Sequence, residues 1–287
     1  MTRGYGQYCP LALAAEMLCE RWTVLIVSRL LDGCSQFSQI HRGVPRISPS
    51  LLSQRLDQLV EAGIVKRAPE QNSASASYLL TPAGLELAPI IEHLAIWGQH
   101  WARDMIDDDL DPAFLLWSLH MRLDPSEMPP GRTVIGFEFT GSRWDCRRFW
   151  LVNDNGRIQM CLKDPGYEVN LQVQSDLRRF IEAWRGIRDL RMEIQAGKIR
   201  LHGPSALKDQ LTDWLLLSML SPYPRKRAGR EKRINASKGR GASSARRRSK
   251  RKIPRCKGKA IGSPRGISDP DNSQAGELVA TLRPRET

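Results

Sequence analysis

A cluster of short polar and basic side chains lies between residues 42 and 57. On a helix that begins at Ser48, a polar side running from Ser50 to Asp57 lies opposite a leucine side. Glutamine pairs bidentately with adenine, serine hydroxyls bond to base edges, and arginine holds phosphates or guanine. Asp57, farther from the helix start, is expected to orient an arginine. The pattern predicts DNA contacts from Arg42, Arg46, Ser48, Ser50, Ser53, Gln54 and Arg55.

The helix that positions this cluster is predicted over residues 48–61. Ser48 is a favourable N-cap, and Pro49 falls at the first helical position, where its missing N–H costs nothing. Leucines at helical spacing mark the buried side, and Gly63 stands where helices commonly end. A shorter helix is predicted before it, over about residues 37–43.

Two short strand candidates follow at residues 64–67 and 78–81, and they predict a β-hairpin with a long polar tip. The tip has no Lys or Arg between residues 70 and 77, so Asn72 and Ser73 are expected to make only neutral contacts with phosphates. A long helix over residues 82–104 comes next, and its apolar residues include Ile90, Leu94, Trp97 and Trp101. This order predicts a winged helix-turn-helix domain over residues 1–104, with a three-helix core, a hairpin wing and a long dimer helix.

Short motifs spread over residues 8–100 carry a resemblance to a known family. They are Cys9-Pro10, Arg21-Trp22, Phe37 with Ile40, the run 47–56, Leu59, the run 63–67, the run 78–81 and Gly84. In these positions the chain resembles the HxlR-type family of bacterial regulators. The resemblance implies a sequence-specific DNA-binding transcriptional regulator. It also implies a homodimer that pairs through the helix 82–104 and the N-terminal helix, with its two recognition helices about 34 Å apart.

The same resemblance makes Cys9 a candidate redox residue. In some relatives the cysteine at the Cys-Pro position senses oxidants or electrophiles. A helix N-terminus stabilises a thiolate, and Cys9 immediately precedes such a terminus. The alternative is a cysteine that belongs to the fold and has no sensing role.

Residues 105–221 have a different pattern, in which apolar and polar residues alternate. Stretches around 135–139, 149–151, 158–162 and 169–173 predict an antiparallel sheet with helices on one side, an α+β domain. The order of elements resembles the sterol-carrier-protein fold, which implies a cavity for a lipophilic effector. Such a pocket would be lined by Trp117, Phe137, Phe139, Trp150, Met160 and Trp184, and each of these residues is also explained as core.

The formal net charge of +13 comes from the C-terminal end of the chain. Residues 221–287 contain 20 Lys and Arg and 5 Asp and Glu, so residues 1–220 have a net charge of −2. Residues 222–287 contain too few large apolar residues to offset the entropy of ordering. We expect a disordered basic tail that adds non-specific affinity for DNA. The alternative is a C-terminus without a selected function.

Motifs of common enzymes and metal sites are missing from the sequence. There is no GxGxxG, GxxxxGK[ST], HExxH or GxSxG pattern, and the six cysteines include no CxxC pair. We therefore expect no enzyme, no cofactor and no metal. No apolar run is long enough to cross a bilayer, and the cysteine spacing indicates reduced thiols in a cytoplasmic protein. The alternative function is a carrier of lipids or small hydrophobic ligands, in which the helical domain serves only dimerisation.

Overall fold

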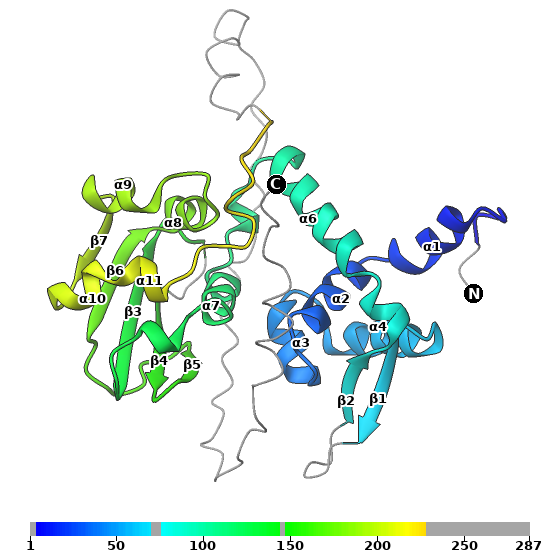
Figure 1. The fold of residues 1–287 in the computed structure, drawn as a ribbon, viewed down its shortest axis with the longest axis horizontal. Coiled ribbons are helices and arrows are strands. Elements are labelled where there is room, and N and C mark those ends of the chain that lie inside the picture. Colours follow the sequence, from blue (N-terminus) through cyan, green and yellow to red (C-terminus); the bar gives the residue numbers. More distant parts are fainter. Residues whose placement is uncertain (1–3, 70–75, 144–146, 228–287) are drawn as a thin grey trace, which may run out of the picture. The chain divides into compact units, whose positions relative to one another are not determined.

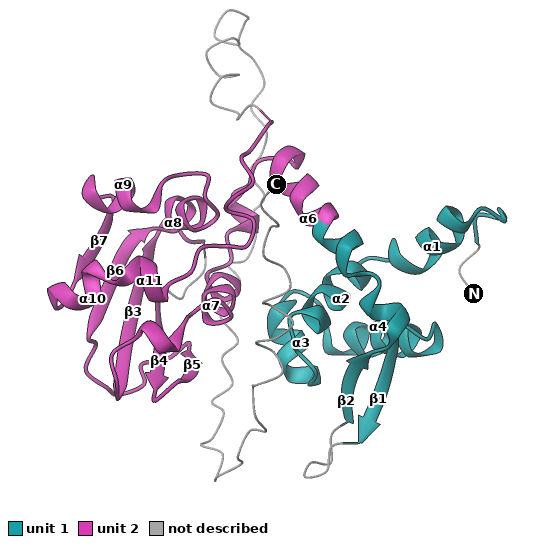
Figure 2. Cartoon of the chain, viewed as in Figure 1, with its two compact units in different colours: residues 1–92, 259–287 teal, residues 93–258 magenta. Residues whose placement is uncertain are grey.

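The computed structural model describes residues 4–69, 76–143 and 147–227. The chain divides into two compact units, one made of residues 1–92 and 259–287 and the other of residues 93–258 (Figure 2). The division falls inside a helix, between Glu92 and His93, whereas the sequence suggested a boundary near residue 104. In the described residues no helix is long and apolar enough to cross a membrane.

The first unit consists of helices and a hairpin (Figure 1). Its helices are α1 (Pro10–Leu18), α2 (Thr23–Leu31), α3 (Phe37–Gly43), α4 (Pro49–Glu61) and α5 (Pro82–Leu85), and its strands are β1 (Val65–Pro69) and β2 (Ala76–Leu80). The two strands pair antiparallel, with Val65 opposite Leu80. Three helices, α2 to α4, followed by a hairpin form the winged helix-turn-helix arrangement that the sequence predicts.

The core of the first unit gathers apolar side chains from α2, α3 and α4. The completely buried ones are Ile26, Val27, Ile40, Leu52 and Leu56. The backbone N–H of Tyr78 in β2 donates to the carbonyl oxygen of Ser35 at 2.8 Å, which fastens the hairpin to the turn before α3. Gly84 in α5 lies against the carbonyl oxygen of Ile64, where any side chain would collide. These contacts fix the hairpin relative to the start of α3 and to α5.

The helix predicted over residues 82–104 is two helices in the structure. α5 ends at Leu85, and α6 runs from Ala88 to Trp101. Pro89 lies in the first turn of α6, where a missing N–H costs little. Within one continuous helix the same proline would leave the carbonyl of Leu85 without its donor. The prediction of a single long helix is therefore wrong.

The second unit contains the C-terminal part of α6, a five-stranded sheet and several short helices (Figure 1). The strands are β3 (Arg132–Thr140), β4 (Arg148–Asp154), β5 (Arg157–Cys161), β6 (Leu171–Asp176) and β7 (Ile199–His202). The helices are η1 (Asp107–Asp109), α7 (Pro112–His120), η2 (Pro125–Glu127), α8 (Leu177–Trp184), α9 (Leu190–Gln195), α10 (Ser205–Asp209) and α11 (Leu211–Trp214).

The sheet is mixed, with the strand order β5-β4-β3-β6-β7. β3 and β6 run parallel, with Ile135 opposite Leu171, and the other neighbours run antiparallel. The prediction of a wholly antiparallel sheet is therefore wrong. Alternating burial predicts which residues face the core, but the pairing partner depends on the path of residues 162–170, which brings β6 beside β3 rather than beside β5.

One face of this sheet carries the hydrophobic core of the second unit. Buried side chains of the strands, such as Phe137 and Val173, join those of α7, α8 and α11, such as Leu116, Phe180 and Trp214. Because successive side chains of a strand point to opposite faces, the neighbours of the core residues lie on the other face of the sheet.

The last described segment packs against the C-terminal end of α6. The backbone N–H groups of Lys226 and Arg227 donate to the carbonyl of His100 at 3.1 and 2.9 Å, and the Arg225 guanidinium donates to the carbonyl of Ala102 at 2.5 Å. These donors satisfy carbonyls that a helix leaves unpaired at its end. The first six residues of the predicted tail are therefore placed in the structure, and residues 228–287 lie outside the described residues.

Candidate nucleic-acid interface

The turn between α3 and α4 sets the start of α4. The Ser48 hydroxyl accepts a hydrogen bond from the backbone N–H of Leu51 at 3.3 Å and lies 3.2 Å from the hydroxyl of Ser50. The Nε2 atom of His41, in α3, lies 3.0 Å from the carbonyl oxygen of Ile47 in the turn. The N-cap predicted at Ser48 is confirmed.

The exposed side of α4 presents the short polar side chains that the sequence singled out. Ser50 and Gln54 are exposed and Ser53 is half-buried, while the leucines of α4 face the core. Arg42, at the end of α3, and Arg46, in the turn, are also exposed. The structure thus brings these five residues to one part of the first unit, around the first two turns of α4.

Arg55 differs from its neighbours because its guanidinium is engaged inside the protein. Its Nε donates to the carbonyl of Arg21 at 3.1 Å, one terminal nitrogen donates to Gln58 at 2.6 Å, and the other to Glu20 at 2.8 Å. The Arg55 side chain is only 12% exposed. The Arg55 side chain therefore links α4 to the turn before α2.

Asp57 forms an ion pair with Arg67 of β1. The guanidinium of Arg67 also lies over the ring of Tyr78, 5.6 Å from the ring centroid. Asp57 therefore holds an arginine of the hairpin, as expected for an orienting carboxylate.

The tip of the hairpin lies outside the described residues, and with it Asn72 and Ser73. The strand leading to the tip carries two exposed cations, Lys66 and Arg67. Neither cation is among the DNA contacts predicted from the sequence, because that prediction considered only the charge of the hairpin tip. The sequence contains a signal for exposed cations on the wing, because in the run Val65-Lys66-Arg67 two charged residues follow an apolar one.

Cys9 is exposed and occupies the N-cap position of α1. Its carbonyl oxygen accepts the first helical hydrogen bond, from the backbone N–H of Leu13 at 3.1 Å. The position before the helix that the sequence indicated is confirmed.

The six residues of the predicted lipophilic pocket lie in or against the core of the second unit. Phe137 and Phe139 are completely buried, and the Phe139 and Phe180 ring centroids are 5.3 Å apart. Trp117 is 6% exposed, and Trp150, Met160 and Trp184 are half-buried. Trp184 Nε1 donates to the carbonyl of Leu216 at 3.1 Å.

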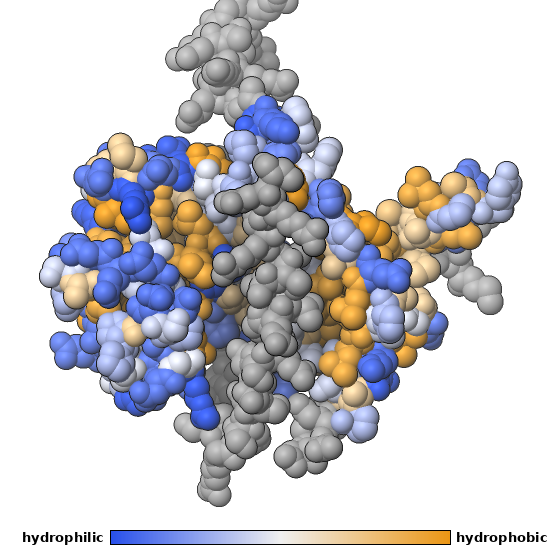
Figure 3. All heavy atoms as spheres, viewed as in Figure 1, coloured by the Kyte–Doolittle hydropathy of each residue, from blue (hydrophilic) through white to orange (hydrophobic). Residues whose placement is uncertain are grey.

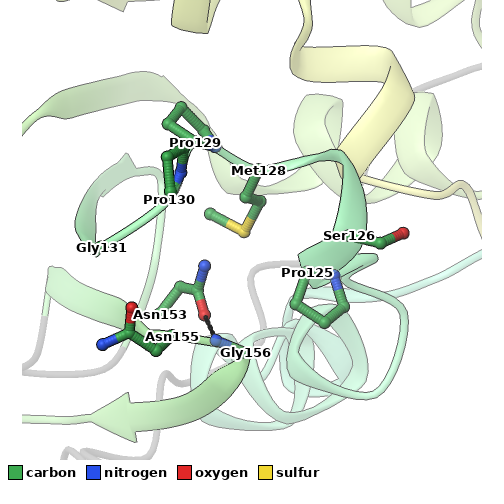
Figure 4. Close-up of a pocket in the computed structure, with 9 residues that line it drawn as sticks. All are labelled: Pro125, Ser126, Met128, Pro129, Pro130, Gly131, Asn153, Asn155 and Gly156. Atoms are coloured by element: carbon green, nitrogen blue, oxygen red, sulfur yellow. Dashed lines mark hydrogen bonds between the residues drawn. The ribbon is translucent and has the colours of Figure 1, made fainter.

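Another part of the second unit forms a cavity of about 380 Å³ beside η2 (Figure 4). Pro125, Met128 and Pro130 line one side, and Asn153 lines the other. Asn153 Oδ1 accepts from the backbone N–H of Gly156 at 2.9 Å. No charged side chain lines this cavity. Across the described residues, no group of three or more His, Cys, Asp or Glu side chains could hold a metal ion.

Comparisons with known proteins match the first part of the chain. A family model described as HxlR-like helix-turn-helix matches residues 17–105. The chain is 38% identical over 113 residues to the HTH-type transcriptional regulator YvaP of Bacillus subtilis, covering 38% of this chain and 96% of YvaP. It is 32% identical over 96 residues to the HTH-type transcriptional regulator YodB of the same organism, covering 32% of this chain and 85% of YodB.

The match to a solved structure covers a similar share of this chain. The reduced form of YodB from B. subtilis is 30% identical with a TM-score of 0.29, and the match covers 32% of this chain and 93% of that chain. Each of these matches covers about a third of the chain.

Proposed function

Because this chain belongs to the HxlR-like helix-turn-helix family of DNA-binding transcriptional regulators, we propose that it binds specific DNA as a homodimer with α4 in the major groove. The family consists of regulators, not enzymes. The observation that carries the proposal is the exposed polar side of α4, where Ser50 and Gln54 stand beside Arg42 and Arg46.

Each of these side chains has a distinct role in the proposal. Gln54 reads adenine, while Ser50 and Ser53 bond to neighbouring base edges. Arg42 and Arg46 hold phosphates and fix the register of the helix on the duplex. Lys66 adds a phosphate contact from the wing.

Arg55 acts indirectly in this proposal. Its bonds to Glu20 and to the carbonyl of Arg21 support a role in orienting α4, since a guanidinium with three partners and little exposure has few donors left for a base. This differs from the direct DNA contact that the sequence suggested.

The homodimer is supported by apolar side chains that the chain leaves exposed. On α6, Ile90, Leu94, Trp97 and Trp101 are each between 46% and 58% exposed, and their spacing of four, three and four residues places them on one side of the helix. α1 has no buried residue, and Figure 3 shows hydrophobic side chains at its surface. Covering these side chains with a second copy would remove a large apolar area from water.

Selection of a binding site followed by anisotropy measurements tests the DNA mechanism. On the selected site, Gln54→Ala should weaken binding by about 1–3 kcal/mol and relax the preference at one base pair. Glu61→Ala is the control, because it truncates an exposed polar side chain in the last turn of α4 and should leave the base preference unchanged. Unchanged site preference in the Gln54 variant would exclude α4 as the reading helix.

The remaining sequence-based hypotheses stay predictions. The resemblance of residues 105–221 to the sterol-carrier-protein fold rests on the order of elements predicted from the sequence. A lipophilic effector would have to enter between the packed rings of Phe137, Phe139 and Phe180. The cytoplasmic location and the sensing role of Cys9 also stay predictions.

A further inference from the structure

A polar pocket of about 410 Å³ lies where β3, β6 and β7 meet the start of α8. The side chains that matter for its chemistry are those of Glu138, Thr140, Gln174, Asp176, Lys198 and Arg200. Because Phe137, Phe139 and Val173 point into the core, the residues next to them lie on the opposite face of the sheet. The pocket therefore lies on the other face of the sheet from the aromatic core.

Strand register arranges these side chains in two rows. Glu138 lies opposite Gln174, and Gln174 lies opposite Arg200. In the next row Thr140 lies opposite Asp176, and Lys198 directly precedes Ile199, which pairs with Ser175. Neighbouring strands are about 4.8 Å apart, so the carboxylate of the first row stands about 10 Å from its cation at the backbone.

The two carboxylates are held in place by the protein. Glu138 Oε2 accepts from the Gln174 amide at 2.9 Å, and Asp176 Oδ1 accepts from the backbone N–H of Arg179 at 3.0 Å. Glu138 Oε1 also forms an ion pair with Arg148 Nε at 3.5 Å. Each carboxylate still has acceptor capacity for a further donor, since a carboxylate has about four lone-pair sites. The acidic side of the pocket is therefore preorganised.

The two cations of the pocket, Lys198 just before β7 and Arg200 on β7, are not held by partners in the way the carboxylates are. Lys198 and Arg200 are exposed, and within the described ranges neither forms a hydrogen bond or an ion pair through its side chain. Arg179, by contrast, is bound to Glu193 at 2.7 Å. Within the described residues, the pocket thus places two cations without a side-chain partner beside two oriented carboxylates.

We propose that this pocket binds a small zwitterion of the amino-acid class. Its carboxylate would pair with Lys198 and Arg200, and its ammonium group would donate to Glu138 and Asp176. A simple anion would be repelled by the two carboxylates, and a lipophile would leave the charged groups desolvated without partners. The volume lies within the range of sites for small molecules.

The test uses the full chain in a thermal-shift screen of the twenty amino acids, with inorganic phosphate and palmitate as comparison ligands. We expect at least one amino acid to raise the Tm by roughly 2–4 °C at saturation. Lys198→Ala and Arg200→Ala should each weaken that ligand at least tenfold by calorimetry, and Glu138→Gln should do the same from the acidic side. Lys163→Ala and Arg147→Ala remove exposed cations elsewhere in the second unit and should leave affinity unchanged.

Three outcomes would overturn the proposal. They are the absence of any amino-acid effect, binding that survives the three pocket substitutions, and stabilisation by phosphate or palmitate alone. Binding of DNA through α4 is measured separately with the Gln54 variant. A negative result for amino-acid binding therefore does not affect the proposed function, and a negative result for DNA binding does not affect the pocket proposal.

Discussion

At the scale of single residues, Arg55 and Gln54 are neighbours on α4 with opposite environments. Gln54 is exposed, whereas Arg55 is tied to Glu20 and to the carbonyl of Arg21. Substitution of Gln54 should therefore change DNA sequence preference, whereas substitution of Arg55 should lower the stability of the first unit.

We expect Arg55→Ala to destabilise the first unit by about 1–2 kcal/mol, because Glu20 loses its charged partner and a carbonyl loses its donor. The measurement is the Tm of the first unfolding transition, with Gln54→Ala as the control that should stay near the parent value. At temperatures well below that transition, the base preference of Arg55→Ala should match the parent protein. An Arg55 variant with normal stability and lost preference would place Arg55 on the DNA instead.

The cysteines differ in their environments. Burial raises the pKa of Cys34 to about 11, with Asp32 adding to the effect and Arg29 opposing it. Cys9 and Cys19 are exposed. Cys34 should therefore stay protonated and unreactive in the folded protein at pH 8.

Mass spectrometry after brief treatment with iodoacetamide or mild peroxide checks this order of reactivity. Cys34 should be modified only after unfolding, and a redox role for Cys9 requires faster oxidation at Cys9 than at Cys19. Because the folded pKa of Cys34 lies above its ordinary value of 9.0, its contribution to stability is present below pH 9 and lost as pH rises towards about 11. A Cys34→Ala variant should lack that loss, and equal labelling of Cys34 and Cys19 would contradict the buried environment.

At the scale of elements, α6 combines an exposed apolar side with a buried polar residue. Gln99 is 1% exposed, and its Nε2 donates to the carbonyl of Arg185 at 3.1 Å. Arg225 donates to Asp104 at 2.8 Å, just beyond the end of the helix. Burial lowers the pKa of Arg185, and the nearby positive charge of Arg225 lowers it further. These contacts fasten the C-terminal half of α6 to the rest of the second unit, while the apolar side of the helix stays exposed.

Leu94→Glu should break the proposed homodimer, because it places a charge in the middle of the apolar side of α6. Sedimentation at micromolar concentration should give a monomer, and DNA affinity should fall roughly tenfold or more as the two half-sites uncouple. Glu92→Lys changes the charge on the opposite side of α6 and should stay dimeric. A parent protein that is already monomeric and binds its site with full affinity would refute the homodimer.

The acidic run before α7 behaves as a structured connection rather than a loose one. Arg178 lies 3.0 Å from Asp107, Arg143 lies 2.9 Å from Asp108, and Arg103 pairs with Asp109. Exposed pairs of this kind stabilise little individually and weaken in salt. The connection between α6 and α7 thus belongs with the second unit.

At the scale of the whole molecule, the uneven charge separates specific from non-specific binding. The basic residues are concentrated beyond residue 221, while the rest of the chain is nearly neutral. Truncation after Arg227 retains the segment that bonds to the end of α6 and removes only residues outside the described ranges.

The truncated chain should show a flatter dependence of DNA affinity on salt, since each phosphate neutralised contributes about 0.9 to the slope of log K against log salt. Site preference should be unchanged, because the reading side chains lie on α4. Anisotropy titrations between low and moderate salt measure both quantities. A truncated chain that loses its preferred site would assign the tail a role in recognition.

Local signals in the sequence were sufficient to predict α4. Ser48 and Pro49 specify where α4 begins, and the leucine spacing specifies which side it buries, because capping and helical periodicity act over a few residues. The same motifs also identified the family.

Only the tertiary structure decided the partners of Arg55, the strand pairing and the charged pocket, because these features depend on contacts between residues distant in the chain. Arg55 meets Glu20 across 35 positions, and β6 pairs with β3 because of the path of the intervening chain. Alternation marked Phe137 and Phe139 as inward-facing, but whether inward-facing rings fill a core or line a cavity depends on how helices pack against them. The charged pocket arises from the register of three strands, and no single stretch of sequence contains that register.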